Sequence, residues 1–256
     1  MKTTYIFITC FLLLTGNMSV AQTRFVTDGT IEFEKSINSF VVIKRQIDAT
    51  NNAYELLMFD QFKKTQPQFK TLKSTLSFSK DKTLFEPASV TDNKYVNFIS
   101  GNPAFEQNNT IYTDLSANSM INQKLVFEQT FLLKDSPRKI NWKITDETRE
   151  IAGYSCRRAN GIMLDSIYVV AFYAEAIPVS GGPESFSGLP GMILGVALPH
   201  DNVTWFATKV NDKPVPPFKA PTKGKVATDK ELRATLESAL KNRGKQMPLM
   251  LKAFLL

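Results

Sequence analysis

The chain has 256 residues, of which 43% are hydrophobic and 21% charged, and its formal net charge is +7. It contains 2 cysteines and 1 histidine, which excludes a zinc cluster of Cys and His ligands and leaves any histidine-dependent triad to His200 alone. The length allows one substantial core, or a core with appendages.

Residues 1–21 have the pattern of a cleavable signal peptide. Lys2 supplies a positive start, residues 5–14 form an apolar run, and Ser19-Val20-Ala21 forms a small-x-small cleavage site. The run is about half of the about 20 residues that a membrane span needs. We therefore expect export to the periplasm or the outer envelope. Cys156 is then the one remaining cysteine, so no intramolecular disulfide is possible.

A strand and two helices are expected next. Residues 29–34 alternate, with Ile31 and Phe33 facing inward, which predicts a first strand. The period then changes to that of a helix whose apolar face carries Ile37, Phe40, Val41, Lys44 and Ile47. After Asn51-Asn52, a second short helix ending before Pro67 presents Tyr54, Leu57, Met58 and Phe62.

Strand patterns dominate the middle of the chain. Alternation predicts half-buried antiparallel strands at residues 72–78, 125–133 and 140–144. Two further segments, 166–173 and 192–198, are apolar on both faces and are expected to be central or covered by another layer, and 203–210 returns to a mixed pattern. Turns are expected at 135–137, Asn160-Gly161 and 200–202.

The composition changes after residue 210. Prolines make 211–227 a linker or strap, and Thr228-Asp229-Lys230-Glu231 forms a capping box that opens a helix. Residues 228–256 are predicted to form a basic helix, ending at Gly244, and an apolar tail. From Trp205 onward there are 11 Lys/Arg against 4 Asp/Glu, whereas residues 22–204 carry 19 against 20. This segment is therefore expected to suit an anionic membrane surface, and no nucleic acid partner is expected.

The most informative segment lies between the two apolar strands. It places glycine or proline at six positions within eleven residues, namely Gly181, Gly182, Pro183, Gly188, Pro190 and Gly191. Such density dictates a backbone path and leaves few side chains for chemistry. A rigid crossover is the main interpretation, with contact to a ligand or partner, or catalysis, as alternatives. We expect Gly188 or Gly191 to have a positive φ, and Leu189 to point inward against Phe172 or Phe186.

The hexapeptide Gly188-Leu189-Pro190-Gly191-Met192-Ile193 resembles the signature of the GLPGLI family of secreted proteins, which has no settled activity. The resemblance extends upstream through Trp142-Lys143-Ile144, Ile151–Cys156, Tyr173 and Ile177-Pro178-Val179. Phe172 and Met192 stand where the family has tryptophan and leucine. The resemblance implies a GLPGLI-type β domain at residues 22–210. If the Gly/Pro loop is a contact surface, the candidate ligand or partner contacts are Phe172, Tyr173, Pro178, Gly182, Pro183, Phe186, Gly188, Leu189, Pro190 and Gly191.

Catalytic readings of the remaining residues are weaker. Cys156 could be a nucleophile beside Arg157-Arg158, but a buried, inert thiol is the ordinary case. His200 is expected to be a solvated turn residue. Isolated surface acids are the ordinary interpretation of Asp146, Glu147, Glu150, Glu175 and Glu184. We expect no catalytic set, no metal site and no cofactor.

These patterns predict a mainly β (α+β) protein, with a curved antiparallel sheet or half-open barrel, N-terminal helices and a C-terminal helix. The architecture is similar to that of periplasmic lipoprotein carriers. The expected function is that of an exported, non-enzymatic envelope protein binding an apolar ligand or an envelope protein in the concavity. The alternatives are an envelope hydrolase or transferase using surface carboxylates or Cys156, and a purely structural or interaction protein.

Overall fold

The computed structural model describes residues 25–50, 52–88, 102–106, 109–164 and 166–256. The predicted signal peptide lies outside these residues. The described residues form a 12-stranded sheet in the order β12-β6-β5-β4-β3-β2-β1-β11-β10-β9-β8-β7. Its strands are β1 Asp28–Asn38, β2 Phe69–Ser79, β3 Lys82–Pro87, β4 Asn109–Asp114, β5 Ser119–Val126, β6 Gln129–Asp135, β7 Lys143–Ile151, β8 Tyr154–Met163, β9 Ile167–Ala174, β10 Met192–Leu198, β11 Val203–Asn211 and β12 Lys225–Ala227.

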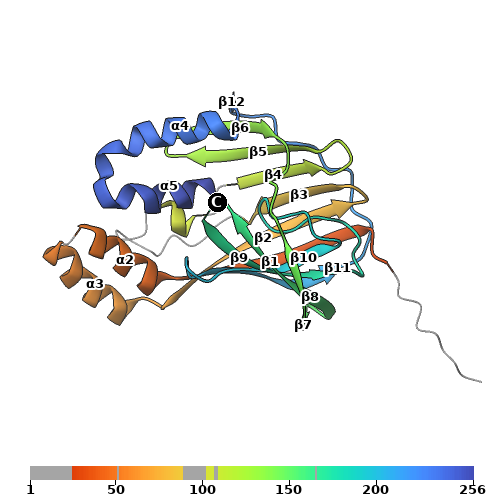
Figure 1. Cartoon of the computed structure of the whole chain (residues 1–256), viewed down its shortest axis with the longest axis horizontal. Helices are drawn as coiled ribbons and strands as arrows, with labels where there is room; N and C mark the ends of the chain where they lie inside the picture. The colour runs from red at the N-terminus through yellow and green to blue at the C-terminus, as the bar shows by residue number, and fades with distance from the viewer. Residues whose placement is uncertain (1–24, 51, 89–101, 107–108, 165) are drawn as a thin grey trace, which may run out of the picture.

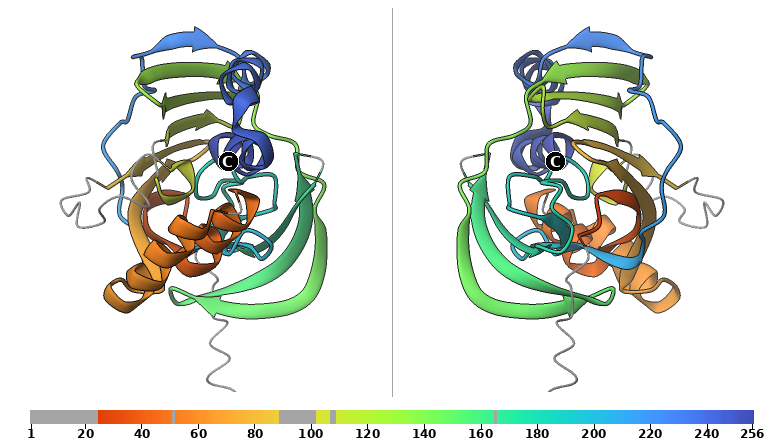
Figure 2. Two further views of the ribbon diagram at one scale, coloured as in Figure 1. Left: turned by 90° about the vertical axis from the view of Figure 1, so that its left-hand side faces the viewer. Right: turned by 90° about the vertical axis from the view of Figure 1, so that its right-hand side faces the viewer.

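The sheet is open and curved. Its neighbouring strands pair antiparallel except β12 with β6, which are parallel, and the edge strands β7 and β12 do not close on each other. The helices are α2 Ser39–Thr50, α3 Ala53–Thr65, η1 Pro103–Phe105, α4 Asp229–Leu240, η2 Lys241–Gln246 and α5 Met247–Leu255. Figure 1 gives the arrangement, and Figure 2 shows the sheet curling around α2, α5 and the loop between β9 and β10. The predicted fold class is confirmed.

The two N-terminal helices form as expected, but one boundary is moved and the predicted inner faces are largely wrong. α2 buries Val42, Ile43 and Ile47, and α3 buries Phe59 and Phe62, whereas Val41, Tyr54, Leu57 and Met58 are exposed. β1 continues to Asn38 and buries Ile31, Phe33 and Ile37 on its inner face, so Ile37 belongs to the strand and not to the helix. The Asn38 side chain accepts a hydrogen bond from the Val41 amide, which helps the chain leave the strand and begin α2. Burial of each large apolar side chain on this face contributes roughly 1.5–3 kcal/mol.

Two strand predictions and one turn prediction were wrong. The strand expected at 140–144 begins only at Lys143, as β7. Residues 125–133 are not one strand, because β5 ends at Val126 and Phe127 adopts φ 54° in a turn. Phe127 is therefore exposed and Val126 buried, the reverse of the predicted alternation. Asn160-Gly161 is no turn but lies inside β8. A Cβ on Gly161 would lie 2.7 Å from Ile140 Cγ2, so close packing is what requires a glycine there.

The C-terminal segment is integrated into the core. The predicted strap ends in β12, which pairs with β6, and the predicted capping box is present at Thr228 and Glu231. The apolar side of α4 and the end of α5 join the inner residues of β5 and β6 in one buried cluster, whose members include Val126, Phe131, Leu133, Leu232, Leu236, Leu240, Phe254 and Leu255. The helix thus covers one end of the concave side.

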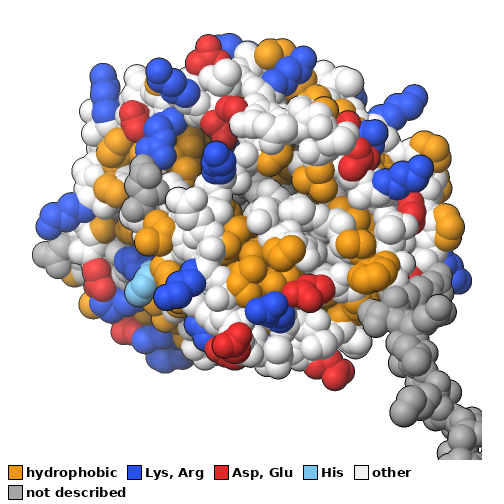
Figure 3. All heavy atoms as spheres, turned by 45° about the vertical axis from the view of Figure 1, so that its right-hand side comes forward, with side chains coloured by type: hydrophobic (Ala, Val, Ile, Leu, Met, Phe, Trp, Pro, Cys, Tyr) orange, Lys and Arg blue, Asp and Glu red, His pale blue; other side chains and the backbone are white. Residues whose placement is uncertain are grey.

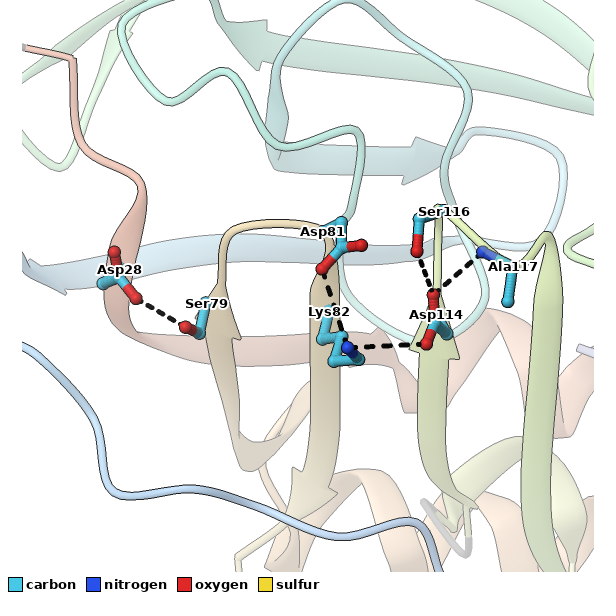
Figure 4. Close-up of polar contacts among 7 residues, drawn as sticks. All are labelled: Asp28, Ser79, Asp81, Lys82, Asp114, Ser116 and Ala117. Atoms are coloured by element: carbon cyan, nitrogen blue, oxygen red, sulfur yellow. Dashed lines mark hydrogen bonds and ion pairs between the residues drawn. The ribbon is translucent and has the colours of Figure 1, made fainter.

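Polar contacts hold the β2–β3 and β4–β5 turns (Figure 4). Lys82 Nζ lies 3.6 Å from Asp114 and 3.9 Å from Asp81, linking the β2–β3 turn to β4. The Ala117 amide and the Ser116 hydroxyl donate to Asp114 and lower the pKa of its carboxyl. Ser79 likewise donates to Asp28 and lowers the pKa of that carboxyl. The carboxylates of Asp114 and Asp28 therefore have a structural role.

Candidate functional site

The signature loop, defined as residues 175–191 between β9 and β10, packs inside the curved sheet. Residues 181–187 and Leu189 are buried, whereas Gly188 and Pro190 are exposed. The Trp142 indole donates to Ser187 O at 2.9 Å, and Ser180 Oγ accepts from the Gly188 amide at 3.0 Å. The loop is therefore held both by the segment that leads into β7 and from within itself.

The predicted backbone geometry of the signature is confirmed. Gly188 has φ 93° and Gly191 φ 154°. The Gly191 amide donates to Leu189 O at 2.8 Å around Pro190, which makes a tight turn. A Cβ on Gly191 would lie 2.4 Å from Ala174 O. Glycine is thus required at 191 both by φ and by the closeness of another backbone.

Leu189 points inward, as predicted, in a buried cluster with Phe186 and Trp205. Phe172 is not its neighbour, because it belongs to a second cluster on the other face of β9, where the Arg149 guanidinium lies 5.7 Å from its ring. The two apolar faces predicted for this strand are therefore both covered.

The ten predicted contact residues divide by exposure. Three of them reach the surface: Pro178, Gly188 and Pro190. The other seven pack inside the chain: Phe172, Tyr173, Gly182, Pro183, Phe186, Leu189 and Gly191. The rigid-crossover interpretation accounts for these seven without any ligand.

A cavity remains on the concave side, with a volume of about 90 Å³. Its wall is built by β1, β5, α2, α5, the signature loop and the β10–β11 turn, which lie far apart in the sequence. The charged residues that line it are Lys35, Arg45, Glu106, Lys124, Glu184, Asp201 and Lys252. Trp205 and Asn109 also line it. The wall therefore combines apolar side chains with these seven charged ones.

Two buried lysines dominate the wall. Lys35 Nζ donates to Glu106 O at 2.8 Å and lies 5.2 Å from the centre of the Trp205 ring. Lys124 Nζ donates to Phe254 O. Burial lowers the pKa of both, and the nearby charge of Arg138 contributes to lowering the pKa of Lys124 to about 8. Each ammonium has three donor hydrogens, so a single carbonyl leaves further capacity.

Acceptors and an unpartnered donor complete the cavity. Asn109 Nδ2 donates to Glu184 Oε2 at 2.8 Å, and Lys252 Nζ lies 2.6 Å from Asp201 Oδ1. Trp205 Nε1 and Asp201 Oδ2 are buried without a hydrogen-bond partner among the described residues. Such groups are rare in folded proteins and point to water or a ligand.

Sequence reasoning missed this cavity. Glu184 was interpreted as a surface acid, which is wrong, because it is 5% exposed. Neither Lys35 nor Lys124 was predicted as a site residue. The sequence does indicate that Lys35 is buried, because it falls in the same alternation as Ile31, Phe33 and Ile37, and a charged residue on an inward face is unusual.

The other candidates behave as ordinary structural residues. Cys156 is fully buried, as predicted, and burial raises the pKa of its thiol to about 12. His200 is exposed in the β10–β11 turn. No group of three or more metal-binding side chains occurs within the described ranges. Nor does any helix in the described part of the chain have the length and apolar character to cross a membrane.

Comparisons with known proteins concern mainly the fold. Residues 161–195 match the family model Porph_ging, a protein family of unknown function. PNGF-II, solved in a C2 crystal, aligns with a TM-score of 0.51 at 13% identity over 81% of this chain and 32% of its own. Its P21 crystal gives 0.49 at 16% identity, over 84% and 34%. An uncharacterized conserved protein from Thermus thermophilus gives 0.38 at 6%, over 79% and 91%. No curated protein matches significantly.

The chain therefore spans about a third of the length of PNGF-II. At this identity the likeness shows a shared fold and nothing about activity.

Proposed function

We propose that the chain is an exported, non-enzymatic cell-envelope protein that holds a ligand or the end of an envelope partner in the cavity on its concave side. The observation that carries the proposal is the cavity of about 90 Å³ with buried charged walls and an unpartnered indole N–H. The proposal of export rests on the pattern of residues 1–21. Membership of the GLPGLI family is proposed on the signature loop, which lies within the matched segment 161–195.

The size and chemistry of the cavity favour a small or terminal polar group over a large apolar ligand. Sites for ordinary organic ligands measure roughly 300–1,000 Å³, several times the volume here. An apolar occupant would also leave the ammonium groups of Lys35 and Lys124 without compensating hydrogen bonds, which is costly.

A hydrolase or transferase is less well supported. Cys156 is buried and its thiol has a raised pKa, so the reactive thiolate is disfavoured. Its side chain belongs to a different buried cluster from Trp205, which lines the cavity. The surface acids at Glu147 and Glu175 form ion pairs with Arg158 and Arg157, which gives them a structural use.

The test is native mass spectrometry of the protein purified from its own envelope. We expect the wild type to carry additional mass, and the double variant Trp205→Phe/Lys124→Met to lose it. Lys134→Met, which removes an exposed lysine of β6, is the matched control and should retain it. A wild-type mass equal to that of the bare chain, with the same copurifying proteins in all variants, would contradict the proposal. Amino-terminal sequencing of the periplasmic fraction should begin at Gln22.

An anionic membrane surface is a second candidate, favoured by exposed charge at the helical end. Lys241, Arg243 and Lys245 of η2 are exposed, and η2 contacts α2. Figures 1 and 2 place the α4–α5 turn at the same end as the α2–α3 hairpin, where Tyr54 and Leu57 are exposed. The face in Figure 3 instead shows lysine and arginine interspersed with acids.

Docking at this end would combine charge with apolar contact. The triple variant Lys241→Gln/Arg243→Gln/Lys245→Gln should reduce binding to vesicles containing anionic lipid at low salt, with no effect on neutral vesicles. Equal binding of the wild type and the variant would exclude this surface.

A further inference from the structure

The cavity carries more positive than negative charge. Its lining contains four basic groups, Lys35, Arg45, Lys124 and Lys252, against three acidic groups, Glu106, Glu184 and Asp201. Lys35 and Lys124 each donate a hydrogen bond to a backbone carbonyl, which is neutral. The two lysines therefore favour a ligand that brings a negatively charged group.

Trp205 supplies an independent indication of a ligand. The side chain is 2% exposed and lines the cavity, with Phe186 at 5.8 Å between ring centres and Lys35 at 5.2 Å. The indole N–H has no acceptor among the described residues. An indole nitrogen only donates, so its missing partner must be an acceptor.

We propose that the cavity binds the carboxylate of a small organic acid, free or at the end of a chain, through Lys35, Lys124 and the indole N–H of Trp205. This inference rests on the proposed function and names its ligand class. A carboxylate offers about four lone-pair sites to converging donors, and charge-assisted hydrogen bonds are roughly twice as strong as neutral ones.

A second buried group without a partner among the described residues, Asp201 Oδ2, narrows the class of ligand. Asp201 Oδ2 is a buried acceptor on the same wall, so a hydroxyl or ammonium group on the ligand gains a further hydrogen bond. At roughly 10–15 Å³ for each water-sized particle, the cavity of about 90 Å³ accommodates a ligand of only a few non-hydrogen atoms. Small hydroxy acids and amino acids therefore fit better than simple fatty acids.

The two tryptophans allow a direct test on the full exported chain. In a ¹H–¹⁵N spectrum, Trp142 and Trp205 give two indole signals, and Trp205→Phe assigns them. Titration with lactate or alanine should shift the Trp205 signal to saturation and leave Trp142, which donates to Ser187 O, unchanged. Propionate should bind more weakly, and lactamide, which lacks the negative charge, should not bind.

Variants separate a carboxylate site from a water-filled cavity. Lys124→Met should weaken lactate binding at least tenfold, because a hydrogen bond to a charged group is lost, whereas Lys134→Met should not change it. Should Lys124→Met fail to fold, calorimetry on Trp205→Phe, which keeps an aromatic ring in place, measures the same loss. The proposal is overturned if no acid shifts the Trp205 signal, if lactamide binds as well as lactate, or if neither cavity variant weakens binding. In those cases the cavity is not a carboxylate site. Added mass in the native protein would still support the proposed function, so the two failures can be told apart.

Discussion

Gly191→Ala is the sharpest test of how the signature loop is built. The residue adopts φ 154°, and an added Cβ would lie 2.4 Å from Ala174 O and 2.9 Å from Ala174 C. The strained φ alone costs about 1 kcal/mol. The clash adds to this, because a backbone carbonyl at the end of β9 cannot rotate away as a side chain can. Forcing the loop to shift costs a further 1–3 kcal/mol, roughly, so we expect a loss of about 3 kcal/mol.

Two other glycines provide matched controls. Gly153, in the β7–β8 turn, has φ 82° with nothing within 4 Å of an added Cβ. Gly188 has φ 93°, and an added Cβ would lie 3.5 Å from Trp142 Nε1, which is ordinary contact. Alanine at either position should therefore cost only the conformational strain, about 1 kcal/mol.

Urea unfolding followed by tryptophan fluorescence measures all three variants. Equal slopes with denaturant would show that the folded and unfolded states keep their exposed surfaces, so that midpoints can be compared as stabilities. The reasoning is refuted if Gly191→Ala loses no more stability than Gly153→Ala, since the closeness of Ala174 would then have no energetic consequence.

The remaining predictions concern burial and charge. Cys156→Ala should cost on the order of 1 kcal/mol without loss of ligand, and the native thiol should resist thiol reagents at pH 8; rapid labelling would contradict this. Lys124 has a folded pKa of about 8 against an ordinary 10.5, so the unfolded state binds more protons between these values and stability should rise with pH there. From pH 7 to 9 the wild type should gain about 1 kcal/mol relative to Lys124→Met; a constant difference would place the pKa elsewhere. Truncation at Thr222 exposes Val126, Phe131 and Leu133, each worth roughly 1.5–3 kcal/mol, so cooperative unfolding should be lost, whereas an intact core would show that the C-terminal segment is separable. Leu189→Ser should destabilise the fold by about 3 kcal/mol, and an unchanged melting temperature would mean that Leu189 does not serve the core.

The sequence predicted the fold class because local patterns carry it. Alternation in β1 and β2, the capping box at Thr228 and the two-faced apolar strands are all signals that neighbouring residues create together. The same patterns missed the β5–β6 turn, because alternation alone predicts that Leu125 and Phe127 both face inward. The hairpin turn at Phe127 requires a positive φ, and the sequence has no glycine or asparagine at that position to indicate a turn.

Pairing of distant segments could not be predicted. β12 joins β6 across about 90 residues of chain, and no local rule links a three-residue strand in a proline-rich strap to a parallel partner. The same limit applies to the C-terminal helix: Leu232 and Leu236 indicate an apolar face, but not that it covers β5 and β6.

Glu184 shows how the signature loop can be both a rigid crossover and part of a contact surface. The glycines and prolines around it lead the chain inward, so that Glu184, whose backbone φ is 51°, is buried. Its carboxylate accepts a hydrogen bond from Asn109 of β4. Its charge favours the protonated forms of Lys35 and Lys124, because it raises the pKa of each against the effect of burial. Because one carboxylate favours the charged form of both lysines, the two ammonium groups stay cationic and keep donor hydrogens for a ligand. A loop whose backbone is fixed for structural reasons can therefore hold the charges that a ligand would meet, and substitutions that loosen it should weaken binding even where they touch no ligand.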